Sequence, residues 1–320
     1  MGIASDTSMD LKLKQSIDGK KRELDRYRPF PASVVRRLGE QFTLEWTYNS
    51  NAIEGNTLSL HETELVMSRG LTVGGKTLRE HFEVLNHVDA IEHLKSFVDN
   101  KRDLSEDLVL AIHRDVMNRI DEDEAGMYRR HNVRIVGAEH IPPSATKIRR
   151  MMAELMTWYH ENRRVIWPPE LATSLHYQLV HIHPFMDGNG RTARLLMNFV
   201  LIMHGYPPAV ILNVDRKKYY RVLKEADRGT MEPFVDFVGR AVNRSLVIYL
   251  NAIKPSTETP DERGGYMTLL EAAGFCSYSQ EYLSFLARTG KLEAVKIRRN
   301  WMTSREALNE YIETHGQDQK

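Results

Sequence analysis

Apolar residues recur three or four positions apart along most of the chain, which is the spacing that places them on one face of an α-helix. The spacing predicts a helix from Ala32 to about Asn51. A second predicted helix begins at Ser59, which forms a capping box with Glu62, and ends before Gly70. The same spacing predicts further helices over residues 79–99, 104–120, 146–162, 169–181, 190–204, 215–228 and 231–254. The predicted fold class is therefore mainly α.

Two segments before residue 254 do not show this spacing. Residues 1–28 are polar and rich in charge without a clear apolar face, which predicts a solvated helix or a loose arm. Residues 132–141 (NVRIVGAEHI) form a run of β-branched residues interrupted by a glycine, which predicts a short β-hairpin. The expected structure is thus helical with one small β element.

The composition changes at residues 254–265 (KPSTETPDERGG), where Pro, Ser, Thr, Gly and charged residues predict a linker. After the linker, caps and turn residues predict a helix, a turn, a second helix, two short strands and a last helix, which is the pattern of a winged helix-turn-helix module. These elements are delimited by Thr268, Gly274, the capping box of Ser277 and Gln280, Gly290, strands near 292–297 and 301–302, and Thr303 with Glu306. The expected parts are an N-terminal helical region (1–100), a core (101–253), the linker (254–265) and this module (266–320).

The composition is that of a globular protein. Lys and Arg number 44 and Asp and Glu number 43, so the formal net charge is +1, which excludes a protein whose whole surface is basic and coats a polyanion. The single cysteine, Cys276, excludes an internal disulfide and a cysteine-based zinc site. The N-terminus lacks the apolar stretch of a signal peptide, and the most apolar run, Leu195 to Met203, is too short to cross a bilayer. We therefore expect a soluble cytoplasmic protein without a membrane partner.

The stretch from residue 183 to 194 (HPFMDGNGRTAR) concentrates groups that bind anions just before the apolar helix LLMNFVLIM. Gly188, Asn189 and Gly190 at the start of that helix leave backbone N–H groups free to face an anion, with the positive end of the helix dipole behind them. Arg191 and Arg194, three residues apart, add two guanidinium groups on the same side of the first turn. The stretch therefore predicts a phosphate-binding site.

Two further residues of the stretch have side chains suited to catalysis. Asp187 is a lone carboxylate of the kind that holds Mg²⁺ together with substrate phosphates. His183 has an ordinary pKa near neutrality, which suits it to accept a proton from an incoming hydroxyl group. The alternative is a plain helix cap with a solvated basic edge. Twelve positions in a fixed order that all serve one geometry favour the functional interpretation.

Two other patterns are weaker. Residues 70–77 (GLTVGGKT) match a phosphate-binding loop, but that loop works only after a buried strand, and here a capped amphipathic helix precedes it. His181 and His183 are spaced like a pair of metal ligands, but the sequence offers no third ligand nearby. His181 is therefore interpreted as a supporting or core residue.

The stretch at 183–194 matches the signature of the Fic proteins, H-P-F-x-[DE]-G-N-G-R-x-x-R, at every defined position, and the resemblance extends over about residues 30–250. It implies a Fic-fold helical core with a β-hairpin flap. The chain is most similar to the Fic adenylyltransferases, which transfer AMP from ATP to Ser, Thr or Tyr hydroxyls of proteins and release pyrophosphate. The resemblance assigns His183 as the general base and Asp187 as the Mg²⁺ ligand. It implies that the phosphates of ATP are bound by Gly188, Asn189, Gly190, Arg191 and Arg194. Doc-type kinases have a different, Lys-containing loop, so phosphate transfer is not expected.

The resemblance extends to an inhibitory motif and to the flap. Ser50, Glu54 and Gly55 (SNAIEG) match [ST]-x-x-x-E-[GN], which implies that Glu54 pairs with Arg194 and inhibits the enzyme in cis. The flap matches Val133 to Ile141, and includes Val136 and Gly137. A flap strand is expected to hold the protein substrate by strand addition.

Further positions align with family features. Tyr219, Tyr220 and Asp227 align with adenosine-pocket positions, the last of which is usually Asn, and the alternative for the tyrosines is ordinary helix packing. Leu78, in GGKTL, aligns with a dimer-forming loop, which implies a homodimer. The alternative is that Leu78 packs on its own chain.

The C-terminal module resembles MerR- or excisionase-type winged helices. Between residues 288 and 305 six basic residues oppose a single acidic one, Glu293, which suits contact with phosphates. The six are Arg288, Lys291, Lys296, Arg298, Arg299 and Arg305. The predicted recognition helix has few base-reading side chains, so contact with DNA and contact with a protein both remain open.

The leading interpretation is a protein adenylyltransferase that uses ATP and Mg²⁺ and also modifies itself. Two alternatives remain: a de-AMPylase, in which the inhibitory glutamate positions water, and a DNA-binding regulator whose Fic core senses nucleotide.

Overall fold

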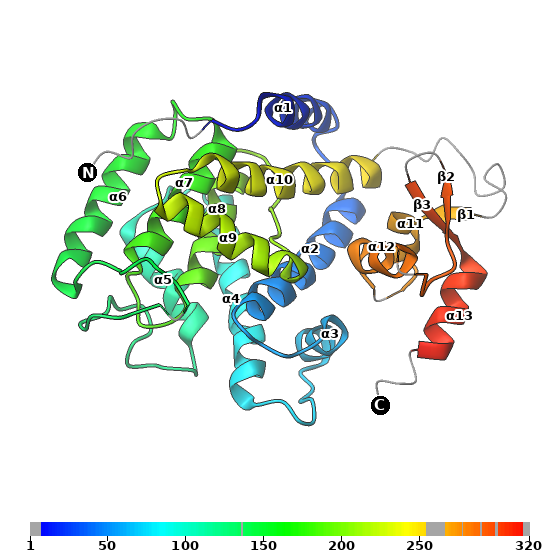
Figure 1. Cartoon of the computed structure of the whole chain (residues 1–320), viewed down its shortest axis with the longest axis horizontal. Helices are drawn as coiled ribbons and strands as arrows, with labels where there is room; N and C mark the ends of the chain where they lie inside the picture. The colour runs from blue at the N-terminus through cyan, green and yellow to red at the C-terminus, as the bar shows by residue number, and fades with distance from the viewer. Residues whose placement is uncertain are drawn as a thin grey trace. The chain divides into compact units, whose positions relative to one another are not determined.

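The computed structural model describes residues 8–135, 137–253, 266–276, 278–288, 290–297 and 300–315. The chain divides into two compact units, unit 1 (residues 1–253) and unit 2 (residues 254–320) (Figure 1). Among the described residues, no helix combines the length and the apolar character that a membrane span requires.

Unit 1 is helical, as the spacing of apolar residues predicts. Its helices are α1 (Leu11–Asp25), α2 (Ala32–Ile53), α3 (Leu60–Arg69), α4 (Leu78–Asp99), α5 (Glu106–Met117), α6 (Ile148–Asn162), α7 (Pro168–Ile182), α8 (Asn189–Met203), α9 (Arg216–Asp227) and α10 (Glu232–Ile253). Two short 3₁₀ helices, η1 (Ala145–Lys147) and η2 (Asn213–Asp215), precede α6 and α9. Residues 70–77 connect α3 to α4 and follow a helix, as expected, so they do not form a phosphate-binding loop.

Helix α8 lies at the centre of unit 1, packed against α7, α4, α5 and α2. Its residues from Leu195 to Leu201 are all buried, which explains why this helix is apolar on every side. The one polar residue among them, Asn198, bonds both backbone groups of Ala209 with its amide and is thereby satisfied. The central position of α8 makes its first turn a rigid support for the residues just before it.

The N-terminal segment differs from its prediction. It forms the helix α1, capped by the Asp10 side chain, and this helix lies along α10 rather than in solvent (Figure 1). Ile17 and Leu24, two turns apart, are fully buried there. Two buried apolar residues in fifteen make too narrow a stripe to stand out in the sequence, although they suffice to dock the helix.

The predicted hairpin also differs. We call residues 133–141 the flap segment; its described residues, 133–135 and 137–141, contain no β-strand. A single turn closes it, where the Ala138 N–H donates to the Ile135 carbonyl oxygen at 3.2 Å. Two isolated strands are marginal without a third strand or a covering layer, which explains the loop. Val136 lies outside the described residues.

Unit 2 contains helices and strands in the predicted order, preceded by one strand that the sequence pattern missed because it has only three residues. The elements are β1 (Tyr266–Thr268), α11 (Leu269–Ala273), α12 (Gln280–Arg288), β2 (Val295–Ile297), β3 (Asn300–Ser304) and α13 (Arg305–His315). The strands form an antiparallel sheet in the order β1-β3-β2. Leu283 and Leu286 of α12 contribute to its core with Leu308. The assignment as a winged helix-turn-helix module stays a prediction, and Ser277, Arg298 and Arg299 lie outside the described residues.

Candidate functional site

The loop between α7 and α8 brings together the residues of the 183–194 stretch. Helix α7 ends at Ile182, and the cap residue after it, His183, adopts a left-handed conformation (φ 51°). Phe185 then points into the core, where it stacks on His113 with the ring centroids 3.6 Å apart. The Asn189 side chain closes the loop, because its Oδ1 accepts from the Phe185 N–H at 3.0 Å and its Nδ2 donates to the Phe185 carbonyl oxygen at 2.9 Å. The loop is therefore held to the first turn of α8.

Two glycines at the start of α8 are required for different reasons. Gly188 has a positive φ (75°), and a Cβ there would lie 3.1 Å from Met117 Sδ. A Cβ at Gly190 would collide with the Glu54 carboxylate. Gly188 is also the N-cap residue of α8 and supplies no side-chain cap. The first turn of α8 thus presents its backbone N–H groups without a capping side chain beside them, as an anion site requires.

His183 is mostly buried, and burial lowers its pKa from 6.5 to about 4, with the Arg129 guanidinium acting in the same direction. The imidazole is therefore neutral at pH 7 and available as a proton acceptor.

Arg129 supports the loop between α7 and α8. It is not singled out in the sequence analysis, because it lies in a polar run without a recognisable motif. It is buried, and it donates to the carbonyl oxygens of His183 (2.7 Å), His131 (2.9 Å) and Pro143 (2.6 Å). His131 and Pro143 flank the flap segment. Arg129 therefore ties both ends of the flap segment to the loop that carries His183.

Asp187 is half exposed and lies between two guanidinium groups. Its carboxylate accepts from Arg79 Nη2 at 2.5 Å and lies 3.4 Å from Arg191 Nη2. Burial by itself raises the pKa of Asp187, but Arg191, the Gly188 N–H and Arg79 outweigh it and lower the pKa below 3.8. Asp187 is therefore ionised. Arg79, at the start of α4, was also missed in the sequence analysis.

Arg191 is buried beside Glu83 of α4, with its Nη1 3.5 Å from Glu83 Oε1. Glu83 also accepts from Asn56 Nδ2 at 2.9 Å and lies 3.4 Å from Arg79 Nε. Among the described residues, Nε of Arg191 has no hydrogen-bond partner. Glu83 thus holds the two arginines that flank Asp187.

Arg194 is only 2% exposed and meets the C-terminal end of α2. Its Nη2 donates to Glu54 Oε1 at 2.7 Å and to the Ser50 carbonyl oxygen at 2.8 Å, and its Nε donates to Ser50 Oγ at 3.0 Å. Burial by itself lowers the pKa of Arg194, but the Glu54 carboxylate reverses this and raises it. Within the described part of the chain, Nη1 of Arg194 has no hydrogen-bond partner.

The end of α2 is fixed from several sides. Arg216 of α9 donates to the Ile53 carbonyl oxygen at 2.7 Å, and the Asn213 N–H donates to Asn49 Oδ1 at 2.8 Å. Gly55, with φ 105°, turns the chain away immediately after Glu54. The Glu54 carboxylate is therefore held at the first turn of α8, although 140 residues separate it from Arg194 in sequence.

The residues aligned with an adenosine pocket take different positions. Tyr219 is 1% exposed and bonds His176 Nε2 at 3.0 Å, as the packing alternative expects. Tyr220 is 40% exposed beside Arg216, so it is the tyrosine that a ligand can reach. Asp227 lies 3.3 Å from His181 Nδ1. Gly137 is exposed in the flap segment.

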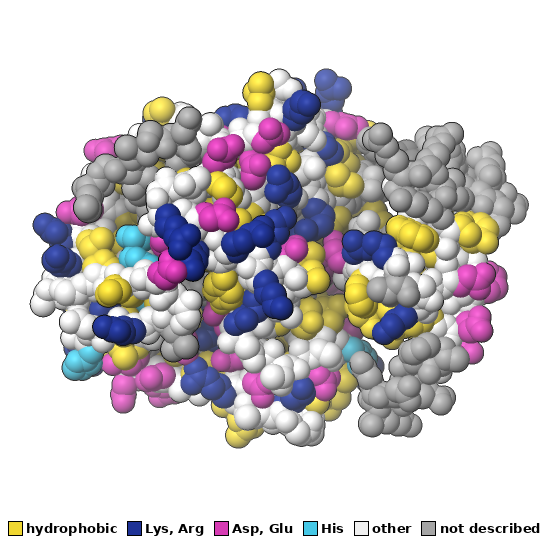
Figure 2. Space-filling model, in the orientation of Figure 1, with side chains coloured by type: hydrophobic (Ala, Val, Ile, Leu, Met, Phe, Trp, Pro, Cys, Tyr) yellow, Lys and Arg dark blue, Asp and Glu magenta, His cyan; other side chains and the backbone are white. Residues whose placement is uncertain are grey.

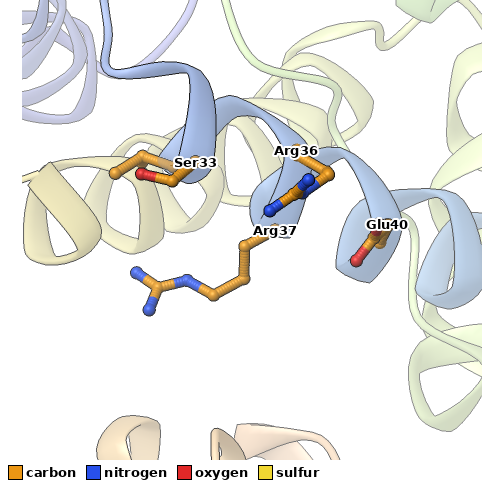
Figure 3. A pocket seen from close by; sticks show the side chains of 5 residues that line it. Ser33, Arg36, Arg37 and Glu40 are labelled. Atoms are coloured by element: carbon orange, nitrogen blue, oxygen red, sulfur yellow. The ribbon is translucent and has the colours of Figure 1, made fainter.

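Three surface features complete the description of unit 1. Figure 2 shows Lys and Arg side chains gathered over α9, where Arg216, Lys217, Lys218, Arg221, Lys224 and Arg228 are exposed. A pocket lined by Ser33, Val34, Arg36, Arg37 and Glu40 lies on α2 (Figure 3). At 1.5 Å per residue it is about 20–30 Å along α2 from Glu54, so it is separate from the candidate site. Leu78, at the start of α4, is 66% exposed.

Comparisons with known proteins identify relatives of this chain. Residues 103–201 match the model of the Fic/DOC family. The chain is 36% identical over 244 residues to the protein adenylyltransferase Fic of Drosophila melanogaster, a match that covers 76% of this chain and 49% of that protein. The chain thus spans about half the length of the curated relatives that it matches.

Solved structures of two relatives are similar over most of unit 1's length. Fic-1 of C. elegans (residues 134–508) is 33% identical with a TM-score of 0.70, covering 77% of this chain and 73% of that one. A Fic domain-containing signaling protein of Bacteroides thetaiotaomicron is 32% identical with a TM-score of 0.70, covering 77% of this chain and 99% of that one. Because these two relatives share about a third of their aligned residues with it and adopt the same fold, the chain belongs to the Fic/DOC family.

Proposed function

We propose that this protein is an adenylyltransferase that moves AMP from ATP to a Ser, Thr or Tyr hydroxyl of a protein, including itself. The observation that carries the proposal is the N-terminus of α8, which has no side-chain cap and lies beside the buried guanidinium groups of Arg191 and Arg194 and the neutral imidazole of His183. The similarity to relatives named protein adenylyltransferase supports the same reaction.

The residues present fit ATP and Mg²⁺. The buried guanidinium groups of Arg191 and Arg194 each retain an N–H group without a partner in the described structure. Such donors favour phosphate oxygens, because a buried N–H without a partner costs about 1–3 kcal/mol. The space beside Gly190, which a side chain at that position would fill, holds the Glu54 carboxylate and becomes available to a phosphate when that carboxylate moves away. Asp187 is ionised and half exposed, which suits a Mg²⁺ ligand.

The roles of the side chains follow from their chemistry. Bound Mg²⁺ and ATP supply an electrophilic α-phosphorus and a pyrophosphate leaving group. His183 accepts the proton of the target hydroxyl as the oxygen bonds to phosphorus and the bond to pyrophosphate breaks. Arg191, Arg194 and the first turn of α8 would hold the outer phosphates. Asp187 would hold the metal ion, in place of its present ion pair with Arg79. The flap segment positions the target by pairing with its backbone.

The same geometry supports inhibition in cis. The Glu54 carboxylate occupies the space beside Gly190 and engages Nη2 of Arg194, so it competes with a phosphate for that donor. We infer that Glu54 keeps ATP out of the orientation needed for attack. The exposed Leu78 supports a homodimer through the start of α4, as the family resemblance implies.

The test uses ATP labelled at the α-phosphate, with parallel reactions labelled at the γ-phosphate. The protein carrying Glu54→Gly should incorporate the α-label into itself or into lysate proteins, and not the γ-label. Adding His183→Ala to that protein should lower incorporation by about 100- to 10,000-fold, the typical value of a general base, while binding of ATP is retained. Incorporation of the γ-label, or unchanged α-label transfer without His183, would contradict the proposal.

A further inference from the structure

Three side chains of metal-binding type meet beside the candidate site. They are His140 of the flap segment, His181 in the last turn of α7 and Asp227 at the end of α9. One ligand atom of each lies within 4.8 Å of the ligand atoms of the other two. The sequence places His181 near His183 but shows no third ligand, because His140 and Asp227 come from segments 41 and 46 residues away.

Contacts around these side chains orient them. His181 Nδ1 lies 3.3 Å from Asp227 Oδ1, and the Tyr177 hydroxyl lies 3.2 Å from the same oxygen. His140 Nε2 lies 2.7 Å from the His181 carbonyl oxygen, and the two imidazole rings stack with their centroids 4.0 Å apart. Partners that fix the direction of a ligand in this way accompany most metal-binding histidines.

We propose that His140, His181 and Asp227 bind a divalent transition-metal ion, with Zn²⁺ as the best match. Two imidazoles and one carboxylate are a ligand set of zinc sites that have three protein ligands. Mg²⁺ prefers oxygen ligands, so the ion proposed for Asp187 does not compete here. Both histidines are only partly buried and Asp227 is exposed, which leaves the ion a path of entry.

The site requires a small movement. Bonds of about 2.0–2.2 Å in a tetrahedron place ligand atoms about 3.4 Å from one another. His181 Nδ1 and Asp227 Oδ1 are already 3.3 Å apart, whereas the three ligand atoms together lie within 4.8 Å of one another. The stacked rings must also turn, so that one nitrogen of each faces the ion. The flap segment, which has no strand among its described residues, is the part able to adjust. Its residue Glu139 already contacts α9, 2.6 Å from Lys224 and 2.8 Å from Arg228.

A bound ion would join the flap segment to the ends of α7 and α9. His181 precedes His183 by two residues, so the junction would lie against the candidate general base. The ion would thereby hold the segment on which the target is expected to dock. Only this last consequence rests on the proposed function; binding of the metal does not.

The direct test is calorimetric titration of the untagged full-length protein with Zn²⁺ in the presence of excess Mg²⁺. One ion should bind per chain, and His140→Ala or His181→Ala should weaken its binding by more than about 100-fold, beyond the effect of losing an outer partner. The matched control is His93→Ala. His93 also pairs with a carboxylate, Asp115 Oδ2 at 2.6 Å, but is not part of a cluster of three ligands among the described residues. Equal binding by the wild type and all three variants, or no binding by the wild type, would overturn the proposal.

Further measurements distinguish loss of the metal site from loss of folding in the variants. Circular dichroism should show that the variants are folded, and Co²⁺ should give a visible absorption band in the wild type and the His93→Ala variant only. Hydrogen exchange of the amides in residues 137–141 should slow on addition of Zn²⁺ in these same two proteins. Binding without slower exchange would refute the tethering of the flap segment and leave the metal site in place.

Discussion

Replacement of Glu54 by Gly removes the only carboxylate that contacts Arg194 in the described structure, and it is the sharpest test of inhibition in cis. The ion pair joins a guanidinium that is 2% exposed to a carboxylate that is 31% exposed, with 2.7 Å between Nη2 and Oε1. Arg194 keeps both of its bonds to Ser50 after the substitution. We therefore expect the protein to stay folded.

The magnitude follows from the contacts. Breaking one partner of a buried ion pair costs about 3–5 kcal/mol, and the partial exposure of Glu54 reduces this to about 1–3 kcal/mol. The melting temperature should fall by about 2–10 °C without ATP. Release of Arg194 restores a charge-assisted hydrogen bond of about 1.5–3 kcal/mol to phosphate, which corresponds to a gain of about 10- to 100-fold in transfer. Correct in-line geometry adds to that gain.

The assay compares autoadenylylation of the two proteins with α-labelled ATP under identical conditions. Glu54→Gln should give an intermediate gain, since the amide keeps the shape but not the charge. Glu40→Gly, in the N-terminal half of α2, controls for the cost of glycine in this helix, about 1 kcal/mol, and should not raise transfer. Equal incorporation by the wild type and the Glu54→Gly variant, with both proteins folded and binding ATP, would refute the inhibitory role.

Three further predictions concern the base, the flap segment and the dimer. Burial lowers the pKa of His183 to about 4. The kcat/KM of the Glu54→Gly protein should therefore be constant from about pH 6 to 8 and fall only near pH 4–5. A decline centred on pH 6.5 would show that His183 is not the base or is not desolvated. Arg129→Ala removes three hydrogen bonds that a buried guanidinium makes to backbone carbonyl groups, and it should lower stability by about 3–5 kcal/mol. The exposed neighbour variant Arg130→Ala should change stability by less than about 0.5 kcal/mol, and equal melting temperatures by calorimetry would refute this. Leu78→Asp should halve the mass measured by light scattering, while Val214→Asp, at a position that is 79% exposed against 66% for Leu78, should not. The same mass for the wild type and Leu78→Asp would exclude that interface.

The local structure of this protein can be predicted from its sequence to a large extent. Apolar spacing and caps such as Ser59 with Glu62 place nearly every helix of unit 1, because these signals act within one or two turns. The 183–194 stretch likewise contains the loop, the candidate anion site and the candidate base within twelve consecutive positions, so the amino-acid sequence alone indicates both the candidate site and the family. The resemblance also pairs Glu54 with Arg194, and the structure has that pair at 2.7 Å.

Contacts between distant segments could not be predicted from the sequence, because they depend on how the helices pack and no local sequence pattern encodes that packing. Arg129, Arg79 and Glu83 lie in ordinary polar runs, and only the tertiary structure brings them to His183, Asp187 and Arg191. The docking of α1 depends on two buried apolar residues, which are too few to produce a clear amphipathic pattern in the sequence. The meeting of His140, His181 and Asp227 has the same origin, since a loop and two helix ends converge there only after α7 and α9 pack. The pKa of His183 also depends on the tertiary structure. From the sequence alone one expects its ordinary value, and the fold lowers it by removing water from around the imidazole.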